Sequence, residues 1–214
     1  MTVMKGALAL LALVAVVALS GCGADPAFTS GKVYLADENY DDAIEQLTLA
    51  IENAPQNWEP HMYLGSAYAE TDQLEKAHDE LFLALELAPD EEARSQAENM
   101  IGYYWQQYNK QGMQYVDAAK YEEAIAQYEK AITIDPRKPD ALTGLGVAYQ
   151  SLGEYDQAIE FFEQAYEAAP ENETIQENLL TVYDSKARSL GSAGEYEEAI
   201  SYYEQIEDIQ PDYP

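Results

Sequence analysis

The chain has 214 residues, which is enough for one compact domain or one short solenoid. Hydrophobic residues make up 47% of it, so a core can be buried, while 40 acidic residues against 11 basic ones give a formal net charge of -29. This charge argues against nucleic acid as a partner, because such affinity comes from neutralising phosphates, and against a protein body that lies on an anionic bilayer.

The first stretch has the pattern of a targeting signal. Lys5 is the only charge before an apolar run at residues 7–19, which is too short for a membrane span and suits a signal-peptide core. Cys22, the only cysteine in the chain, follows Leu19-Ser20-Gly21. These residues resemble the lipobox of bacterial type II signal peptides. The resemblance implies that residues 1–21 are cleaved off and that Cys22 is the site of lipid attachment; an ordinary signal peptide with a leftover thiol is the alternative.

Residues 22–26 are expected to form a short lipid-anchored tether. Gly23 rather than Asp follows Cys22, which by the same resemblance favours the outer membrane of a Gram-negative cell, on its periplasmic face. In a cell with a single membrane, the anchor would lie on the outer leaflet. Two or three acyl chains anchor a protein stably without a transmembrane helix. Four extended residues reach about 14 Å, so the first repeat is expected close to the membrane.

A two-segment pattern then returns five times. Apolar residues recur at the helical period in two successive segments of each unit, with a turn between them. A small residue stands near the start of every second segment, at Ala43, Ala77, Ala124, Ala158 and Ala199. Each unit ends in a proline, at Pro55, Pro89, Pro136, Pro170 and Pro211. The small residue allows the two helices of a hairpin to cross closely.

Two further positions recur in the same register. Four residues after each alanine stands a core side chain: Leu47, Leu81, Tyr128, Phe162 or Tyr203. The first segments carry Gly31, Gly65, Gly112 and Gly146, which weaken to Ala187 in the fifth unit. This pattern resembles the tetratricopeptide repeat, whose period is about 34 residues. The resemblance implies an all-α, right-handed superhelical solenoid of about five helix-turn-helix hairpins, at residues 27–57, 58–91, 92–138, 139–172 and 173–214.

The third and fifth units contain extra residues. These additions, at Glu91–Tyr104 and Glu171–Leu179, are rich in helix formers and nearly free of Gly and Pro. We therefore expect them to lengthen the first helix of each unit rather than to form loops. In the last unit, the charged Glu207 stands where other repeats pack on a neighbour, and Ile206 and Ile209 are expected to remain uncovered. A homodimer or partner contact through this C-terminal repeat is a further prediction.

Residues that carry chemistry are scarce. His61 and His78 are the only histidines, and a metal site built from them would need Cys or further His ligands within reach. No nucleophile elbow, phosphate loop or paired-carboxylate signature is found. The sequence therefore predicts a protein that is not an enzyme and holds neither a metal nor a cofactor.

The resemblance implies instead that partners bind in the concave groove lined by the first helices. Carried over residue by residue, the groove positions in the three middle repeats are Met62, Ser66, Asn109, Met113, Thr143 and Val147. The chain departs from the Lys and Asn pattern of the carboxylate-clamp members, which argues against an acidic C-terminus as ligand. A mildly apolar groove rimmed by carboxylates suits a neutral or basic extended segment or helix. The overall acidity fits either solubility in a salty habitat or a docking surface for a basic partner.

Two functional classes follow. The first is a lipid-anchored protein-interaction scaffold of the bacterial envelope, of the pilus, outer-membrane assembly or cell-wall hydrolase adaptor type. The second is a non-enzymatic carrier of a small ligand or glycan. Its site would be the aromatic cluster Tyr103, Tyr104, Trp105 and Tyr108. Packing within and between repeats is the alternative explanation of that cluster.

Overall fold

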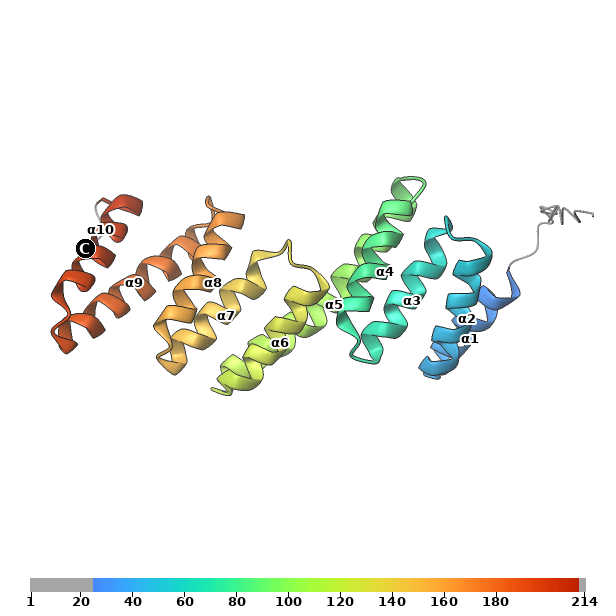
Figure 1. The fold of residues 1–214 in the computed structure, drawn as a ribbon, viewed down its shortest axis with the longest axis horizontal. Helices are drawn as coiled ribbons and strands as arrows, with labels where there is room; N and C mark the ends of the chain where they lie inside the picture. The colour runs from blue at the N-terminus through green and yellow to red at the C-terminus, as the bar shows by residue number, and fades with distance from the viewer. Residues whose placement is uncertain (1–24, 212–214) are drawn as a thin grey trace, which may run out of the picture.

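The computed structural model describes residues 25–211. In this part of the chain all regular structure is helical, and ten α-helices stand as five hairpins along one axis (Figure 1). The helices are α1 (Pro26–Ala36), α2 (Tyr40–Asn53), α3 (Trp58–Glu70), α4 (Leu74–Leu87), α5 (Glu91–Asp117), α6 (Tyr121–Ile134), α7 (Pro139–Leu152), α8 (Tyr155–Ala168), α9 (Glu173–Ala193) and α10 (Tyr196–Ile209). The predicted all-α solenoid of about five hairpins is confirmed. The predicted signal peptide and Cys22 lie outside the described residues.

Local signals begin each hairpin. Asp25, Asn57, Asp90 and Asn172 stand just before α1, α3, α5 and α9, and each side chain accepts a hydrogen bond from a backbone N–H of the first turn. These bonds satisfy donors that the helix itself leaves unpaired. The remaining first helix, α7, begins with Pro139, whose missing N–H costs nothing at this position. Each hairpin therefore begins at a residue that the local sequence specifies.

The two helices of each hairpin cross where a glycine faces a large side chain. The facing pairs are Gly31 with Leu47, Gly65 with Leu81, Gly112 with Tyr128, and Gly146 with Phe162. A Cβ added to any of these glycines would lie 2.6–2.7 Å from the side chain opposite, closer than packed carbon atoms approach. In the last hairpin Ala187 stands at the position of the glycine, and the partly buried Tyr202 packs against it, while Tyr203 is 44% exposed. The glycine thus allows the facing side chain to become the centre of the hairpin core.

The helix α5 serves two hairpins. It runs for 27 residues, whereas the second helix of every hairpin has 14. Its N-terminal half packs against α3, where Tyr104 donates a hydrogen bond to the Glu70 carboxylate and Tyr108 donates to the Ala69 carbonyl. Its C-terminal half pairs with α6 through Gly112. The extra residues thus extend α5 across the junction between the second and third hairpins, and α9 is likewise long at 21 residues.

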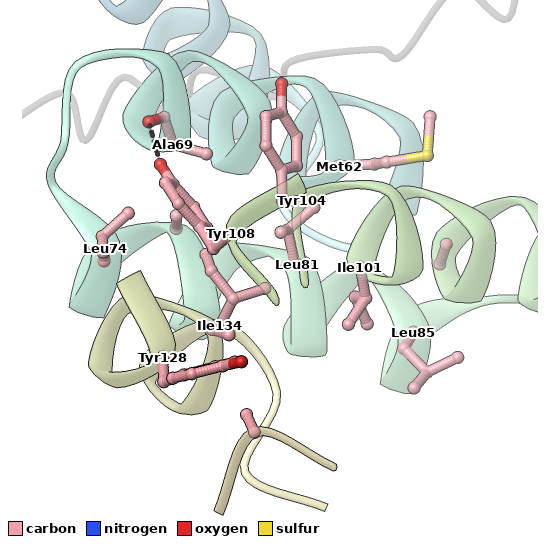
Figure 2. Close-up of a cluster of buried hydrophobic side chains, with 14 of the residues drawn as sticks. Met62, Ala69, Leu74, Leu81, Leu85, Ile101, Tyr104, Tyr108, Tyr128 and Ile134 are labelled. Carbon is pink, nitrogen blue, oxygen red and sulfur yellow. Dashed lines mark hydrogen bonds between the residues drawn. The ribbon is translucent and has the colours of Figure 1, made fainter. Parts of the chain in front are cut away.

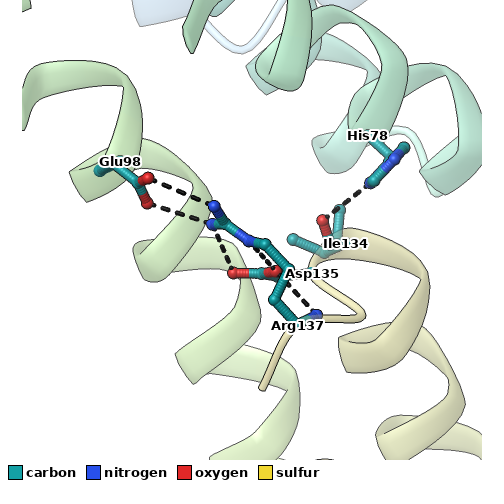
Figure 3. Close-up of polar contacts among 5 residues, drawn as sticks. All are labelled: His78, Glu98, Ile134, Asp135 and Arg137. Atoms are coloured by element: carbon teal, nitrogen blue, oxygen red, sulfur yellow. Dashed lines mark hydrogen bonds and ion pairs between the residues drawn. The ribbon is translucent and has the colours of Figure 1, made fainter. Parts of the chain in front are cut away.

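A buried carboxylate fixes the turn between α6 and α7 to α5 (Figure 3). Asp135 is fully buried and accepts hydrogen bonds from the backbone N–H of Arg137 at 3.1 Å and from its guanidinium at 2.8 and 3.0 Å. The same guanidinium donates to both carboxylate oxygens of Glu98 on α5. Burial alone would raise the pKa of Asp135, but the hydrogen bonds from Arg137 outweigh it and lower that pKa below its ordinary value. Asp135 therefore stays ionised in the folded protein.

The C-terminal hairpin differs from the prediction. Ile206 was expected to leave apolar surface uncovered, and this is wrong, because Ile206 is buried in a cluster with Phe162 and Tyr183. The exposed apolar side chains of α10 are instead Tyr196, Ile200 and Tyr203, spaced along one face of the helix. Within residues 25–211, no helix combines the length and hydropathy needed to span a bilayer.

Candidate interaction surface

Four of the six predicted groove residues come together in one hollow. Asn109 and Met113 lie one turn apart on α5, and Thr143 and Val147 lie one turn apart on α7. The hollow between them has a volume of about 370 Å³. We call this site the α5–α7 hollow. It is lined by Asn109, Met113, Tyr128, Asp140, Thr143, Gly144, Val147, Asn172, Thr174 and Ile175.

The ring of Tyr128 reaches this hollow from α6. It lies between Gly112 on α5 and Gly144 on α7, and a Cβ at either glycine would overlap the ring. Burial, together with the nearby charge of Asp117, raises the pKa of Tyr128 to about 12. Its hydroxyl therefore keeps its proton at neutral pH. The first turn of α9 contributes Thr174 and Ile175 to the lining.

The lining is mostly uncharged and partly apolar. Asp140 is its only charged residue, and Met113 projects with 56% of its surface exposed. The Thr143 hydroxyl donates to the Pro139 carbonyl at 3.0 Å, so this donor is already used within α7. A flexible thioether beside an open hollow can adapt to an apolar side chain of a partner. The hollow thus suits an apolar anchor rather than a charged one.

The other two predicted groove residues lie elsewhere. The prediction for Met62 is wrong, because Met62 is only 5% exposed and belongs to the buried core. It borders the base of a second hollow, of about 530 Å³, which we call the α3–α5 hollow and which is lined by Met62, Tyr63, Gln96, Asn99, Met100 and Tyr103. The prediction for Ser66 is wrong, because Ser66 is only 2% exposed and its hydroxyl donates to the Met62 carbonyl at 3.0 Å. The cause is the long helix α5, which covers this part of α3 through Tyr104, whose hydroxyl lies 3.4 Å from the Ser66 carbonyl.

The predicted aromatic cluster does not converge on one site. Tyr104 and Tyr108 are buried in the core between α3 and α5, as Figure 2 shows, so their assignment to ligand binding is wrong. Burial, with the charges of Asp72 and Glu70, raises the pKa of Tyr108 to about 12. Trp105 instead lies beneath the Lys138 ammonium, 4.8 Å from the ring centre. Only Tyr103 is freely exposed, at 58%, because neighbouring residues of a helix point to different sides.

Sequence reasoning missed a third hollow on α5. It has a volume of about 530 Å³ and is lined by Tyr103, Gln106, Gln107, Lys110, Gln111 and Gln114. Tyr103 borders both this hollow and the α3–α5 hollow. The available signal was the charge pattern, since Lys110 is the only charged residue from Asn99 to Val116. That absence of charge is unusual in a chain with 40 acidic residues.

The acidic residues concentrate on the second helices. The five second helices carry 20 Asp or Glu residues among 70, whereas the five first helices carry 10 among 86. The surface formed by α3, α5, α7 and α9, which we call the first-helix surface, contains all three hollows described above. Acidic residues are therefore less dense on the first helices than on the second helices. In the described part of the chain, no group of three His, Cys, Asp or Glu side chains is arranged to hold a metal.

Comparisons with known families cover most of the described chain. A model described as tetratricopeptide repeat matches residues 28–92, a second with the same description matches residues 138–212, and a model described as TPR repeat matches residues 112–153. All five hairpins lie at least partly within the matched ranges. The predicted repeat family is confirmed by these matches.

Individual relatives are distant. Photosystem I assembly protein Ycf3 from two strains of Prochlorococcus marinus is 24% and 26% identical over 86 and 84 residues. These alignments cover 39% and 38% of the chain, which spans about half the length of these curated relatives. Among solved structures, a MamA protein is 22% identical with a TM-score of 0.37, covering 86% of this chain and 90% of that one. MamA from Desulfovibrio magneticus is 16% identical with a TM-score of 0.38, covering 86% and 93%.

Proposed function

Since the chain is built of tetratricopeptide repeats, we propose that it is a non-catalytic scaffold that binds a partner polypeptide on its first-helix surface. Stacked repeats produce extended surfaces of this kind, and proteins use them for recognition. The observation that carries the proposal is the α5–α7 hollow, where residues from four helices surround a weakly charged space beside the exposed Met113. A hollow beside an exposed, adaptable side chain can receive a partner's anchoring residue.

The proposed setting is the bacterial envelope, with the protein held at a membrane by lipid on Cys22. The support is the sequence of the first 22 residues, which resembles a type II signal peptide. The proposed partner is an envelope protein of neutral or basic character, because the acidic second helices would repel an acidic one. We propose that the protein acts in pilus assembly, in outer-membrane assembly or as an adaptor of a cell-wall hydrolase.

Replacing Cys22 by Ser is expected to abolish lipid attachment, because acylation at this position requires the sulfur. Cells would be grown with an alkyne fatty acid, and the protein would be recovered and scored for label and for membrane association. The matched control is Ser20→Ala, which keeps the cysteine and a small residue before it. Label that persists in Cys22→Ser would exclude the proposed anchor.

Replacing Met113 by Asp is expected to reduce partner recovery at least about 10-fold, which corresponds to about 1.4 kcal/mol. An anchoring contact would be lost and a charge placed in an uncharged hollow. The measurement is affinity capture of the full protein from crosslinked native envelope, with quantitative mass spectrometry. Only proteins whose recovery depends on Met113 count as partners of this surface.

The matched control is Leu49→Asp, which changes another exposed aliphatic side chain, on α2. This variant has the same added charge and is expected to retain the partners of the wild type. Because Met113 and Leu49 are 56% and 43% exposed and neither is in the core, both variants are expected to fold. Equal recovery from Met113→Asp and wild type would refute the proposed surface.

A further inference from the structure

The helix α10 exposes a row of large apolar side chains that the other second helices bury. Tyr196, Ile200 and Tyr203, which we call the α10 row, are 68%, 54% and 44% exposed. They stand three residues before, one after and four after the repeat alanine Ala199. All residues at these places in the other second helices are buried or half-buried: Tyr40, Ile44 and Leu47 on α2, Leu74, His78 and Leu81 on α4, Tyr121, Ile125 and Tyr128 on α6, and Tyr155, Ile159 and Phe162 on α8.

At a junction between hairpins, the first helix of the next hairpin covers this row. The junction of α6 with α7 shows this directly, because the ring of Tyr128 packs against Gly144 on α7 and is only 3% exposed. Ala141 and Ala148, also on α7, are 0% exposed and belong to the same core cluster as Tyr128. Among the described helices, α10 contacts only α9. Tyr203, which stands at the place of Tyr128, therefore has no first helix packed on it within residues 25–211.

The helix α1 exposes the opposite side of such a junction. Pro26, Thr29 and Val33, which we call the α1 row, are exposed, Val33 at 54%. Relative to the repeat alanine, they stand at the places of the three α7 residues that pack on the hairpin before them. On α3, the residues at the first and third of these places are Pro60 and Ala67, and both are fully buried. The α1 row thus has compact side chains where the first helices α3 and α7 pack on a preceding hairpin.

We propose that the α10 row of one copy of this chain binds the α1 row of a second copy, so that the solenoid continues from copy to copy. The contact would bury large side chains of α10 against compact ones of α1, as α6 and α7 do within the chain. Within one copy the two rows belong to hairpins at opposite ends of the structure and do not meet (Figure 1). Because the two rows differ, every added copy presents a new α10 row, and the assembly is an open series rather than a closed dimer.

Charge and size select this pairing over the two symmetric ones. Five of the 14 residues of α10 are Asp or Glu and none is Lys or Arg, whereas α1 has no acidic residue and carries Lys32. Two α10 rows face to face would bring five acidic side chains from each copy together, and like charges in a contact oppose association. Two α1 rows would bury little apolar area, because neither has a large side chain. The contact of α10 with α1 avoids both costs.

Sedimentation velocity on the mature chain with Cys22→Ser tests the inference, since neither an acyl chain nor a disulfide can then join copies. The protein is measured over a range of concentrations in high salt, which screens the repulsion between strongly acidic copies. We expect the average mass to rise with concentration through the dimer to larger species. A mass that stays at one copy, or that stops at two, would overturn the inference.

Two variants, each blocked at one end, identify the contact. Val33→Asp places a carboxylate in the α1 row, and Ile200→Asp places one in the α10 row. Each variant alone is expected to associate at least about 10-fold more weakly than the parent, because a charge would be buried in an apolar contact. An equimolar mixture of the two should form a dimer as tightly as the parent does. In that dimer the unaltered α10 row of the Val33→Asp copy meets the unaltered α1 row of the Ile200→Asp copy.

The control is Leu49→Asp on α2, which adds the same charge outside both rows and is expected to associate like the parent. Val33 and Ile200 are each 54% exposed, so both blocked variants are expected to fold, and circular dichroism verifies this. Undiminished association of Val33→Asp alone would mean that two α10 rows bind each other and would overturn the inference, as would a mixture that remains monomeric. Self-association and partner capture are separate measurements, so this inference and the proposed function can fail independently.

Discussion

Replacing Gly146 by Ala is expected to lower the free energy of unfolding by about 3 kcal/mol. The added Cβ would lie 2.6–2.8 Å from three ring carbons of Phe162, and the ring is fully buried and cannot move aside without leaving the core. Overpacking of this kind costs about 1–3 kcal/mol, and loss of a buried phenyl group costs about 3–5 kcal/mol. Urea denaturation followed by circular dichroism would measure the change.

The matched control for this substitution is Gly191→Ala. Gly191 is also helical, but a Cβ there would have no atom within 4 Å. This variant is expected to be as stable as the wild type or more stable by up to about 1 kcal/mol, since Ala favours helix over Gly. A second test combines Gly146→Ala with Phe162→Ala, which should be no less stable than Phe162→Ala alone because the clash is gone. Equal stability of Gly146→Ala and wild type would contradict the close crossing of α7 and α8.

Replacing Arg137 by Ala is expected to cost about 2–3 kcal/mol at neutral pH. It removes the partner of Asp135, whose side chain is 0% exposed, and leaves a buried charge supported only by a backbone N–H. It also breaks the link from Glu98 on α5 to the turn before α7. Because α5 and α7 form the walls of the α5–α7 hollow, partner binding there should weaken as well.

The stability difference between wild type and Arg137→Ala should depend on pH. The folded protein lowers the pKa of Asp135, so the network stabilises the protein above the ordinary carboxyl range, near pH 4, and loses its effect as the pH falls through the lowered value. Wild type and Arg137→Ala should therefore differ most at neutral pH and converge in acid. The control is Asp135→Asn with Arg137→Ala, which removes the unpaired charge and should recover part of the loss. A difference that does not change with pH would contradict the role assigned to Asp135.

The sequence alone predicts the features that depend on residues close together in the chain. Alanine, proline and helix-capping residues recur at fixed places in each unit, and they specify where helices begin, cross and end through hydrogen bonds and steric contacts within a few residues. The repeat spacing then places α5 and α7 as first helices of adjacent units, which is why Asn109, Met113, Thr143 and Val147 were predicted together. The low density of charge along α5 from Asn99 to Val116 is likewise visible in the sequence.

Only the tertiary structure decided which side of the extended α5 is covered. Ser66, Tyr104 and Tyr108 are polar or amphipathic residues that suit a ligand site or a core equally well. The helix α5 packs Tyr104 and Tyr108 against α3, covers Ser66 there, and leaves Tyr103 exposed. The physical reason is that burial depends on contacts between residues nearly 40 positions apart, as in the bonds from Tyr104 to Ser66 and from Tyr108 to Ala69. Helical periodicity predicts in which direction a side chain points from the helix axis. Which other helix covers that side chain depends on how the helices pack against one another.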